Sequence, residues 1–444
     1  MYPQAKKPQM RGFDDLDRRI LAVAAPAFVA LVTEPLMLLA DTAIIGHLGT
    51  TELGGLAAAS VVLTTVVGLC VFLAYGSTAA VARRHGAGRE AEAYGLAVGA
   101  LWLALGLGVV LGLGTAVASD AMSRALSSSA AVATQGDRYL VISAAAVPAM
   151  LVVLAATGAL RGVLDLRTPL VVAAVANVLN VVLNFVLVYG FHLGIGGAAT
   201  GTVIAQWVAA LWLGVVVVRR AMAAQASVRP QVGAIVRAGR DGVPLLVRTA
   251  TLRASLVLAT AVAADLGDVP LAAQQVATSV VTFLAFGLDA IAIAGQALTG
   301  RTLGAGDAAR TRALTRRMVA WGIGTGLVAA VVLAATSPLL ARMFTPDPAV
   351  QEALVPALLV VALIQPLSGV VFVLDGVLIG AGDGVYLAWA GLAVLAVYAP
   401  FALAVGALDA SFAWLWAAYG AFIAARLVTL WLRQRGDRWM VLGA

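Results

Sequence analysis

The chain has few of the residues on which soluble enzymes and metal centres depend. Only 11% of its 444 residues are charged, whereas soluble domains carry about 25%. It has one cysteine, Cys70, which excludes an intramolecular disulfide and a multi-cysteine metal site. Its three histidines, His47, His85 and His192, are far apart in sequence and show no zinc or haem ligand spacing. An ordinary soluble enzyme is therefore excluded, and no metal site is expected.

Motifs for group transfer are also missing. The chain has no Walker-type Gly-Lys-Ser/Thr, so ATP does not power it directly, and no serine, histidine and acid constellation stands out. With 29 basic and 22 acidic residues the net charge is +7, but the basic residues form short clusters between apolar stretches. Such clusters do not form a surface that tracks nucleic acid. We expect no enzyme activity, no cofactor and no nucleic-acid partner.

Hydrophobic residues make up 62% of the chain, and the mean hydropathy is +0.98. A membrane-spanning helix needs roughly 20 apolar residues, and twelve stretches of the sequence meet this need. We expect an all-α membrane protein that uses the lipid bilayer as its solvent. The predicted spans are 20–44, 54–76, 94–117, 134–157, 168–190, 197–218, 242–264, 271–298, 317–336, 352–379, 385–407 and 411–432.

Lysine and arginine gather in every second connection between these spans. The loops around Gly49, Gly194, Gly267 and Asp409 contain neither residue. By the positive-inside rule, both termini of this multi-pass protein are predicted to be cytoplasmic. The basic clusters lie in the N-terminal tail, at Arg83, Arg84 and Arg89, at Arg161 and Arg167, from Arg219 to Arg240, from Arg301 to Arg317, and from Arg426 to Arg438.

The sequence matches itself at an offset of 218 residues. Pro26 falls on Pro244, Arg83 on Arg301, and Gly162 on Gly380. We therefore predict two six-helix bundles, with an N-terminal bundle over 1–218, a cytoplasmic linker over 219–241 and a C-terminal bundle over 242–444. Since six is even, the two bundles are parallel repeats related by an axis along the membrane normal, a plan typical of secondary transporters.

Two carboxylates lie in the first span, Glu34 and Asp41. An ionisable group at the bilayer centre costs about 2.5 to 3.5 kcal/mol, so each needs a partner or a purpose. Their seven-residue spacing places them within about 20° of each other on one helix face. Glu34 is therefore a candidate coupling residue together with Asp41, although it could equally be an ion-pair partner or a residue at a cavity mouth. Pro26 and Pro35 weaken the hydrogen bonds of the same helix and are candidate hinges.

A polar stripe follows in the fifth and sixth spans. Asn177, Asn180 and Asn184 repeat at i, i+3 and i+7, and Thr202 and Gln206 are one turn apart. We expect these residues to line a polar cavity in the N-terminal bundle, with Asp41 as a proton or cation site. The alternatives are a carboxyl that is merely hydrogen-bonded to asparagine, and amides that only join helices.

The second half carries its own intramembrane charges, Arg248 and Arg253 in span 7, Asp289 in span 8 and Asp375 in span 10. Neither these acids nor those of the first span recur at the repeat position, so the shared scaffold does not require them. Arg248 could neutralise one or both carboxylates. Alternatively, Asp289 and Asp375 with Arg248 could form a second coupling-ion site.

With these residues in view, the chain resembles the multidrug and toxic compound extrusion (MATE) family, in its DinF-like branch. The resemblance covers residues 14 to 435. Its strongest stretches are EPLMLLADTAIIGHLGT from Glu34, RGVLDLRTPL from Arg161, NVLNVVLN from Asn177, LDAIAIAGQALTGRTLGAGD from Leu288 and LDGVLIGAGD from Leu374.

The resemblance implies a V-shaped, two-lobe exporter of organic compounds, lipophilic cations in particular, driven by H⁺ or Na⁺. It implies Asp41 as the acidic site of the N-terminal lobe, beside Asn180, Asn184 and Thr202. Some DinF-like relatives have a second acid where this chain has Asn184. Asp375 matches an acidic cation-binding position of another branch, but Arg248 and Arg253 stand where that branch has an acidic partner. Protons are therefore favoured over Na⁺.

A lipid-linked precursor flippase of related architecture is the alternative function, and it would show a strongly cationic central cavity. A channel disagrees with the unequal charges of the two halves. The composition, with only two lysines, fits a GC-rich bacterium. We expect a monomer in the bacterial cytoplasmic membrane.

Overall fold

The computed structural model describes residues 15–127 and 129–443, apart from the side chains of Glu34 and Leu38. Over these ranges the chain is almost entirely helical, and no strand occurs in them. The α-helices are α1 Asp15–Gly46, α2 Thr50–Leu69, α3 Phe72–Gly86, α4 Glu90–Leu126, α5 Ala130–Ser143, α6 Val147–Gly162, α7 Arg167–Phe185, α8 Gly194–Ala223, α9 Val232–Asp265, α10 Asp268–Gly304, α11 Ala308–Phe344, α12 Pro348–Gly380, α13 Gly384–Ala407 and α14 Phe412–Arg435.

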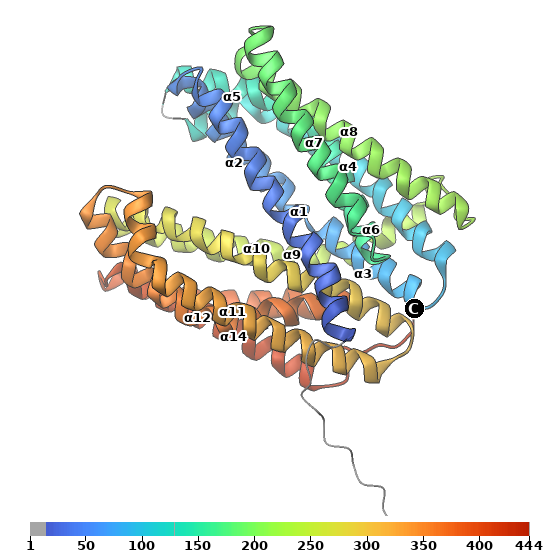
Figure 1. Ribbon diagram of the computed structural model, residues 1–444. Coiled ribbons are helices and arrows are strands. Elements are labelled where there is room, and N and C mark those ends of the chain that lie inside the picture. Colours follow the sequence, from blue (N-terminus) through green and yellow to red (C-terminus); the bar gives the residue numbers. More distant parts are fainter. Residues whose placement is uncertain (1–14, 128, 444) are drawn as a thin grey trace, which may run out of the picture.

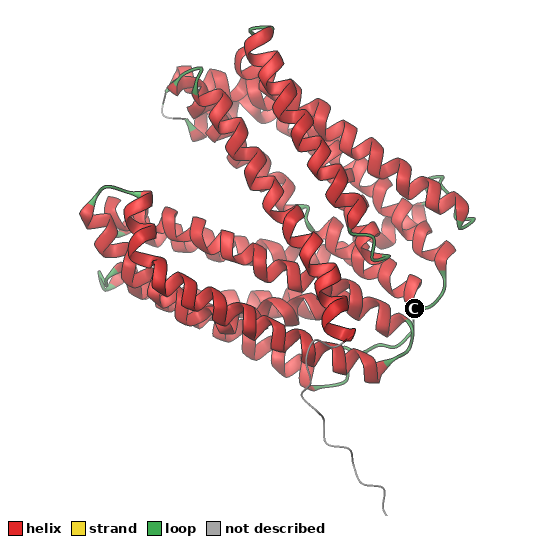
Figure 2. Ribbon diagram, in the orientation of Figure 1, coloured by secondary structure: helices red, strands yellow, loops and turns green. Residues whose placement is uncertain are grey.

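These helices provide twelve segments long and apolar enough to cross a membrane, which confirms the predicted number of spans. Two spans are interrupted. Cys70 and Val71 separate α2 from α3, and a 3₁₀ turn over Ala144–Ala146 separates α5 from α6 just before Pro148. A π turn over Val186–Gly190 ends α7. The connections between spans are short loops gathered at the two ends of the molecule (Figure 2).

The helices form two bundles that diverge from one end, as the predicted V requires (Figure 1). The N-terminal bundle contains α1 to α8, and the C-terminal bundle contains α9 to α14. α1 contacts both bundles, packing on α7 in its own and on α10 in the other. The bundles also meet where α3 packs against α9 and α10, and where α4 packs against α9. The chain therefore has the predicted all-α architecture of two parallel six-helix bundles.

Close packing between helices repeats at the 218-residue offset. A Cβ on Gly158 would lie 2.3 Å from the Ala74 carbonyl oxygen, and a Cβ on Gly376 would lie 2.4 Å from that of Ala292. Only glycine permits backbones to approach so closely. The same relation holds for Gly162 on Thr78 and Gly380 on Gln296, and for Gly108 on Pro148 and Gly326 on Pro366.

One repeated contact joins the two bundles. A Cβ on Gly86 at the end of α3 would lie 2.1 Å from the Arg301 carbonyl oxygen, and a Cβ on Gly304 at the end of α10 would lie 2.0 Å from that of Arg83. Residues of one repeat thus contact the equivalent residues of the other reciprocally, as at a two-fold axis. This crossing lies at the end where the bundles converge.

Polar contacts also tie the converging ends together. The Arg83 guanidinium on α3 donates to the carbonyl oxygens of Ala381 at 2.6 Å, Val441 at 2.8 Å and Gly443 at 2.9 Å. On α1, the buried Asp17 carboxylate accepts from Arg317 and from the Trp321 indole of α11. Opening this end requires these bonds to break.

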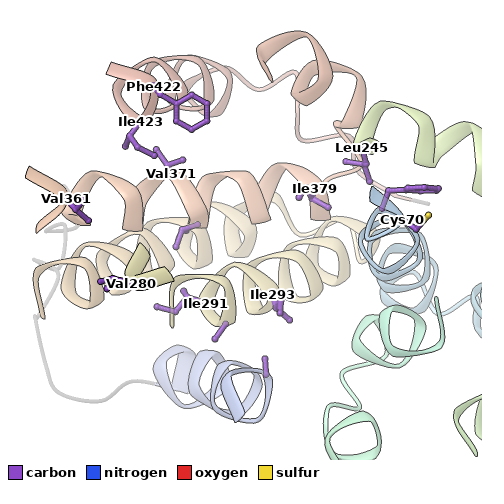
Figure 3. Close-up of a cluster of buried hydrophobic side chains, with 14 of the residues drawn as sticks. Cys70, Leu245, Val280, Ile291, Ile293, Val361, Val371, Ile379, Phe422 and Ile423 are labelled. Carbon is purple, nitrogen blue, oxygen red and sulfur yellow. The ribbon is translucent and has the colours of Figure 1, made fainter. Parts of the chain in front are cut away.

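A large apolar cluster extends through both bundles (Figure 3). Its labelled members come mainly from α10, α12 and α14, and the cluster also contains Cys70 at the α2–α3 break and Leu245 of α9. Cys70 is buried and unbonded. The core of the C-terminal bundle therefore continues into the region where the bundles meet.

Candidate functional site

Asp41 lies in the last third of α1 and is 3% exposed. Its Oδ1 accepts a hydrogen bond of 2.6 Å from Nδ2 of Asn184, on α7. No described lysine, arginine or histidine forms an ion pair with this carboxyl group. An ionised carboxylate that is removed from water without a cationic partner is costly, so this is a position where a bound cation gains energy.

The hydrogen bonds continue from Asp41 across three helices. Nδ2 of Asn184 also donates to Oδ1 of Asn180 at 3.3 Å, and Nδ2 of Asn180 donates to Oγ1 of Thr202 on α8 at 3.0 Å. Both asparagines are completely buried, and Thr202 is 4% exposed. The i, i+4 spacing of Asn180 and Asn184 places both amides on one helix face. The structure thus brings Asp41, Asn180, Asn184 and Thr202 into one buried hydrogen-bond network.

One polar atom in this hydrogen-bond network has no partner. Oδ1 of Asn184 is buried and accepts no hydrogen bond from the described residues. It lies against Gly201 of α8, where a Cβ would come within 2.1 Å of it. The amide can donate to a carboxylate through Nδ2, or accept from a carboxylic acid through Oδ1 after a half rotation. Asn184 is therefore suited to either protonation state of Asp41.

The other predicted residues of this bundle take no part in these hydrogen bonds. Asn177 donates to the Thr33 carbonyl oxygen of α1 at 3.1 Å. Gln206 is half-buried on α8, one turn beyond Thr202, and enters none of the hydrogen bonds above. The side chain of Glu34 is outside the described residues. Pro26 and Pro35 are both within the continuous helix α1.

In the C-terminal bundle, Asp375 is held by two arginines. Arg248 of α9 forms an ion pair with its carboxylate, with Nε 3.3 Å from Oδ1, and Nη2 of Arg426 on α14 lies 3.4 Å from Oδ2. All three side chains are at most 11% exposed. This geometry favours the prediction that Arg248 neutralises a carboxylate, because two guanidinium groups stabilise the ionised form of Asp375.

Asp289 on α10 also belongs to this cluster. It interacts electrostatically with Arg248 and Arg426 and also with Arg161 of α6. The ring of Tyr75 on α3 lies 5.7 Å below the guanidinium carbon of Arg248. The cluster of Tyr75, Arg161, Arg248, Asp289, Asp375 and Arg426 therefore joins the two bundles.

Two members of this cluster, Arg161 and Arg426, also belong to the basic clusters that the positive-inside rule predicts to be cytoplasmic. Arg161 is half-buried in the last turn of α6, and Arg426 is 9% exposed within α14. The signal for Arg426 was available, since it falls inside the predicted span 411–432. Arg161 lies four residues beyond its predicted span, and nothing in the sequence indicated that α6 continues to Gly162.

A fourth acidic residue, Asp165, lies in the connection between α6 and α7. Burial raises the pKa of its carboxyl group, but hydrogen bonds from Thr168 and Arg220 outweigh this, so the pKa is below its usual value. Oδ1 accepts from the Thr168 amide at 3.0 Å, and Oδ2 lies 2.5 Å from Nη2 of Arg220. Asp165 thus caps the start of α7 and ties it to α8.

The described residues contain no cluster of three or more histidine, cysteine or acidic side chains that could hold a metal ion. Twelve membrane-spanning helices in two parallel six-helix bundles that diverge from one end are the architecture of a two-lobe membrane transporter.

The comparisons identify its family. The MatE family model matches residues 26–186 and 244–423, two stretches that begin 218 positions apart. The chain belongs to this family of multidrug and toxin efflux transporters, whose members are not enzymes, so the predicted family is confirmed.

Similar proteins include the DNA damage-inducible protein F of Escherichia coli, which is 31% identical over 95% of this chain and 94% of that protein. Protein DETOXIFICATION 44, chloroplastic, of Arabidopsis thaliana is 30% identical over 97% of this chain and 85% of that protein. Among solved structures, a MATE transporter in a bent conformation superimposes with a TM-score of 0.87 at 21% identity, covering 95% of this chain and 96% of that one. The structural likeness supports the same fold.

Proposed function

We propose that this transporter exports organic compounds, lipophilic cations in particular, in exchange for protons, and that Asp41 is the residue that carries the proton. Asn180, Asn184 and Thr202 support the carboxyl group and bind polar parts of the substrate when the site opens. Asn177 and Gln206 extend this polar surface.

The observation that carries the proposal is the contrast between the buried carboxyl groups of Asp41 and Asp375. Asp375 is paired with two arginines, so it has no need of a further cation. Asp41 is buried with an asparagine amide as its hydrogen-bond partner. Because a neutral amide cannot compensate the charge, binding a cation at Asp41 removes a cost of several kcal/mol. That cost can couple cation binding to a change of conformation.

A proton fits this site better than Na⁺. Hard metal cations are bound by several oxygen atoms at once. Here Oδ1 of Asn180 faces the Asn184 amide and Oγ1 of Thr202 accepts from Asn180, so both oxygens are engaged. The free oxygen of Asn184 lies against Gly201. A proton needs only the carboxyl oxygen itself.

Alternating access follows from the two-bundle architecture. The converging end carries the C-terminal residues and the contacts of Arg83 and Asp17, and we propose that it faces the cytoplasm of a bacterial cell. The transporter would then be open to the outside. Pro26 and Pro35 each remove one hydrogen bond from α1, which contacts both bundles, so a bend of α1 can transmit the state of Asp41.

The energetics allow one proton per substrate. One charge that moves through 100 mV releases about 2.3 kcal/mol. At about 1.4 kcal/mol per tenfold ratio, this sustains roughly a fifty-fold substrate gradient. We propose that a monomer carries out the cycle, because one chain contains both bundles.

The decisive experiment measures efflux of a fluorescent lipophilic cation from proteoliposomes. An imposed pH gradient is applied with and without Na⁺ to the wild type and to Asp41→Asn. The matched control is Asp409→Asn, which changes a carboxylate in an exposed loop. We expect efflux that follows the pH gradient without Na⁺ in the wild type and the control, and its loss in Asp41→Asn.

Coupled export that persists in Asp41→Asn would refute the role of Asp41. Efflux that requires Na⁺ would show that Na⁺, and not the proton, is the coupling ion. If neither gradient moves the cation, the same vesicles are tested for transfer of a fluorescent lipid between leaflets. Lipid transfer would then favour the flippase alternative.

A further inference from the structure

A small, partly open cavity of about 20 Å³ lies in the C-terminal bundle, between α9, α12, α13 and α14. Its polar wall contains Arg248, Asp375 and Arg426, and the rest is largely apolar, with Leu252 and Val394 among the lining residues. The proton-coupled cycle proposed above makes no use of this cavity. It is separate from Asp41, which belongs to the other bundle.

The charges around the cavity do not balance. Three arginines, Arg161, Arg248 and Arg426, interact with two carboxylates, Asp289 and Asp375. The other ionisable groups that face these arginines in the described part of the chain are tyrosines, which carry no charge at neutral pH. One positive charge is therefore left without compensation in the protein interior, where an unpaired ion is costly.

The side chains that line the cavity themselves carry an excess of positive charge. Asp375 is shared between Arg248 and Arg426, and these two guanidinium groups both line the cavity. Asp289 is shared among all three arginines. The wall of the cavity therefore has two positive groups and one negative group. The side-chain hydroxyl of Thr429 donates to the Arg426 carbonyl oxygen at 2.9 Å, so it already has a partner.

We propose that a small inorganic anion, chloride in the first instance, binds in this cavity between Arg248 and Arg426. A cavity holds a water molecule when it offers about 10 to 15 Å³, so this one has room for one monatomic ion. A carboxylate-bearing substrate is too large for it. Water would fit, but it carries no charge and leaves the guanidinium groups uncompensated.

Anion binding is tested first by thermal unfolding of the purified full-length protein in detergent. Tryptophan fluorescence is followed while sodium chloride replaces sodium gluconate at constant ionic strength. Because a ligand that binds only the folded state stabilises it, we expect the unfolding midpoint to rise with chloride and then to saturate. Arg426→Gln should remove this rise.

The matched control is Arg253→Gln. Arg253 is also on α9, but it lies against Gly68 of α2 and does not line the cavity. It should keep the chloride response of the wild type. A complementary variant, Val394→Asp, places a fixed carboxylate in the cavity wall and should be insensitive to chloride. Crystals soaked in sodium bromide should show an anomalous peak between Arg248 and Arg426.

Two results would overturn the proposal. One is a wild-type midpoint that is equal in chloride and gluconate, and the other is a chloride response that Arg426→Gln keeps. If Arg426→Gln and Val394→Asp do not fold, the bromide peak in the wild type decides, and its absence refutes the site. These readouts do not measure transport, so their failure leaves the proton-coupled export intact.

Discussion

Replacing Asp41 and Asp375 by asparagine, one at a time, should have different effects on stability and transport. The substitution is the same at both sites and preserves the shape of the side chain. Asp375→Asn removes the negative charge shared by Arg248 and Arg426. Asp41→Asn removes a charge that is paired with no described basic residue and that is hydrogen-bonded to Asn184.

The magnitudes follow from these partners. Breaking a buried ion pair by removing one partner costs about 3 to 5 kcal/mol, because the other charge is left uncompensated. We expect Asp375→Asn to lose stability in this range, since it strands two guanidinium groups. A neutral hydrogen bond contributes about 0.5 to 1.5 kcal/mol, so Asp41→Asn should change the stability by no more than about that amount. Transport should nevertheless stop in Asp41→Asn.

The assay is unfolding in detergent, combined with efflux from proteoliposomes for every variant that folds. A double variant, Asp375→Asn with Arg426→Gln, provides the internal control, because it removes one of the stranded charges. It should recover part of the lost stability, and the double-mutant cycle measures the coupling. Our reasoning would be refuted if Asp375→Asn were as stable as the wild type while Asp41→Asn unfolded readily.

Three further predictions concern the scaffold. Gly86→Ala should lower the thermal unfolding midpoint, because its Cβ would lie 2.1 Å from a carbonyl oxygen of the other bundle. The control Gly106→Ala, which has open space around it, should leave the midpoint unchanged or raise it slightly. Arg83→Gln should weaken the converging end, seen as faster hydrogen exchange over residues 437–443; unchanged exchange would contradict this. The pKa of Asp165 is lower in the folded protein than in the unfolded chain. Its contribution to stability is therefore complete well above about pH 4 and is lost as the pH falls through the pKa of the folded state. In Asp165→Asn, the free energy of unfolding should decrease less steeply as the pH is lowered.

The spans and the repeat were predictable because they depend on properties of the sequence alone. Each helix must be apolar over its length to cross the bilayer, and twelve such stretches appear in the structure. The repeat was visible in glycine, proline and arginine, and the structure shows why glycine recurs. Gly158 and Gly376 sit at equivalent helix crossings that exclude a side chain.

The neighbourhood of Asp41 was partly predictable. Helical spacing fixes which asparagines share a face, so the sequence indicated that Asn180 and Asn184 lie together. It could not indicate that Asn177 turns to the backbone of α1 at Thr33, because that depends on how α1 and α7 pack. The roles of these residues in coupling stay predictions.

The arginines show where sequence reasoning reaches its limit. Positive residues near span ends are usually cytoplasmic, and the rule assigned Arg161 and Arg426 there. What the rule could not predict is that these side chains also interact with carboxylates of other helices, Arg161 with Asp289 and Arg426 with Asp375. A one-dimensional pattern gives the position of a charge along a helix but not the helix that it faces.

The duplication separates what the scaffold needs from what transport needs. Contacts that hold the helices together, such as those of Gly86 and Gly304, occur in both halves. The buried carboxyl groups do not, since Asp41 and Asp375 occupy positions without an acidic counterpart in the other repeat. A symmetric frame with unequal charges allows one bundle to respond to a cation while the other keeps a fixed charge. On this division, Asp41→Asn should abolish coupling, whereas Asp375→Asn should first reduce stability.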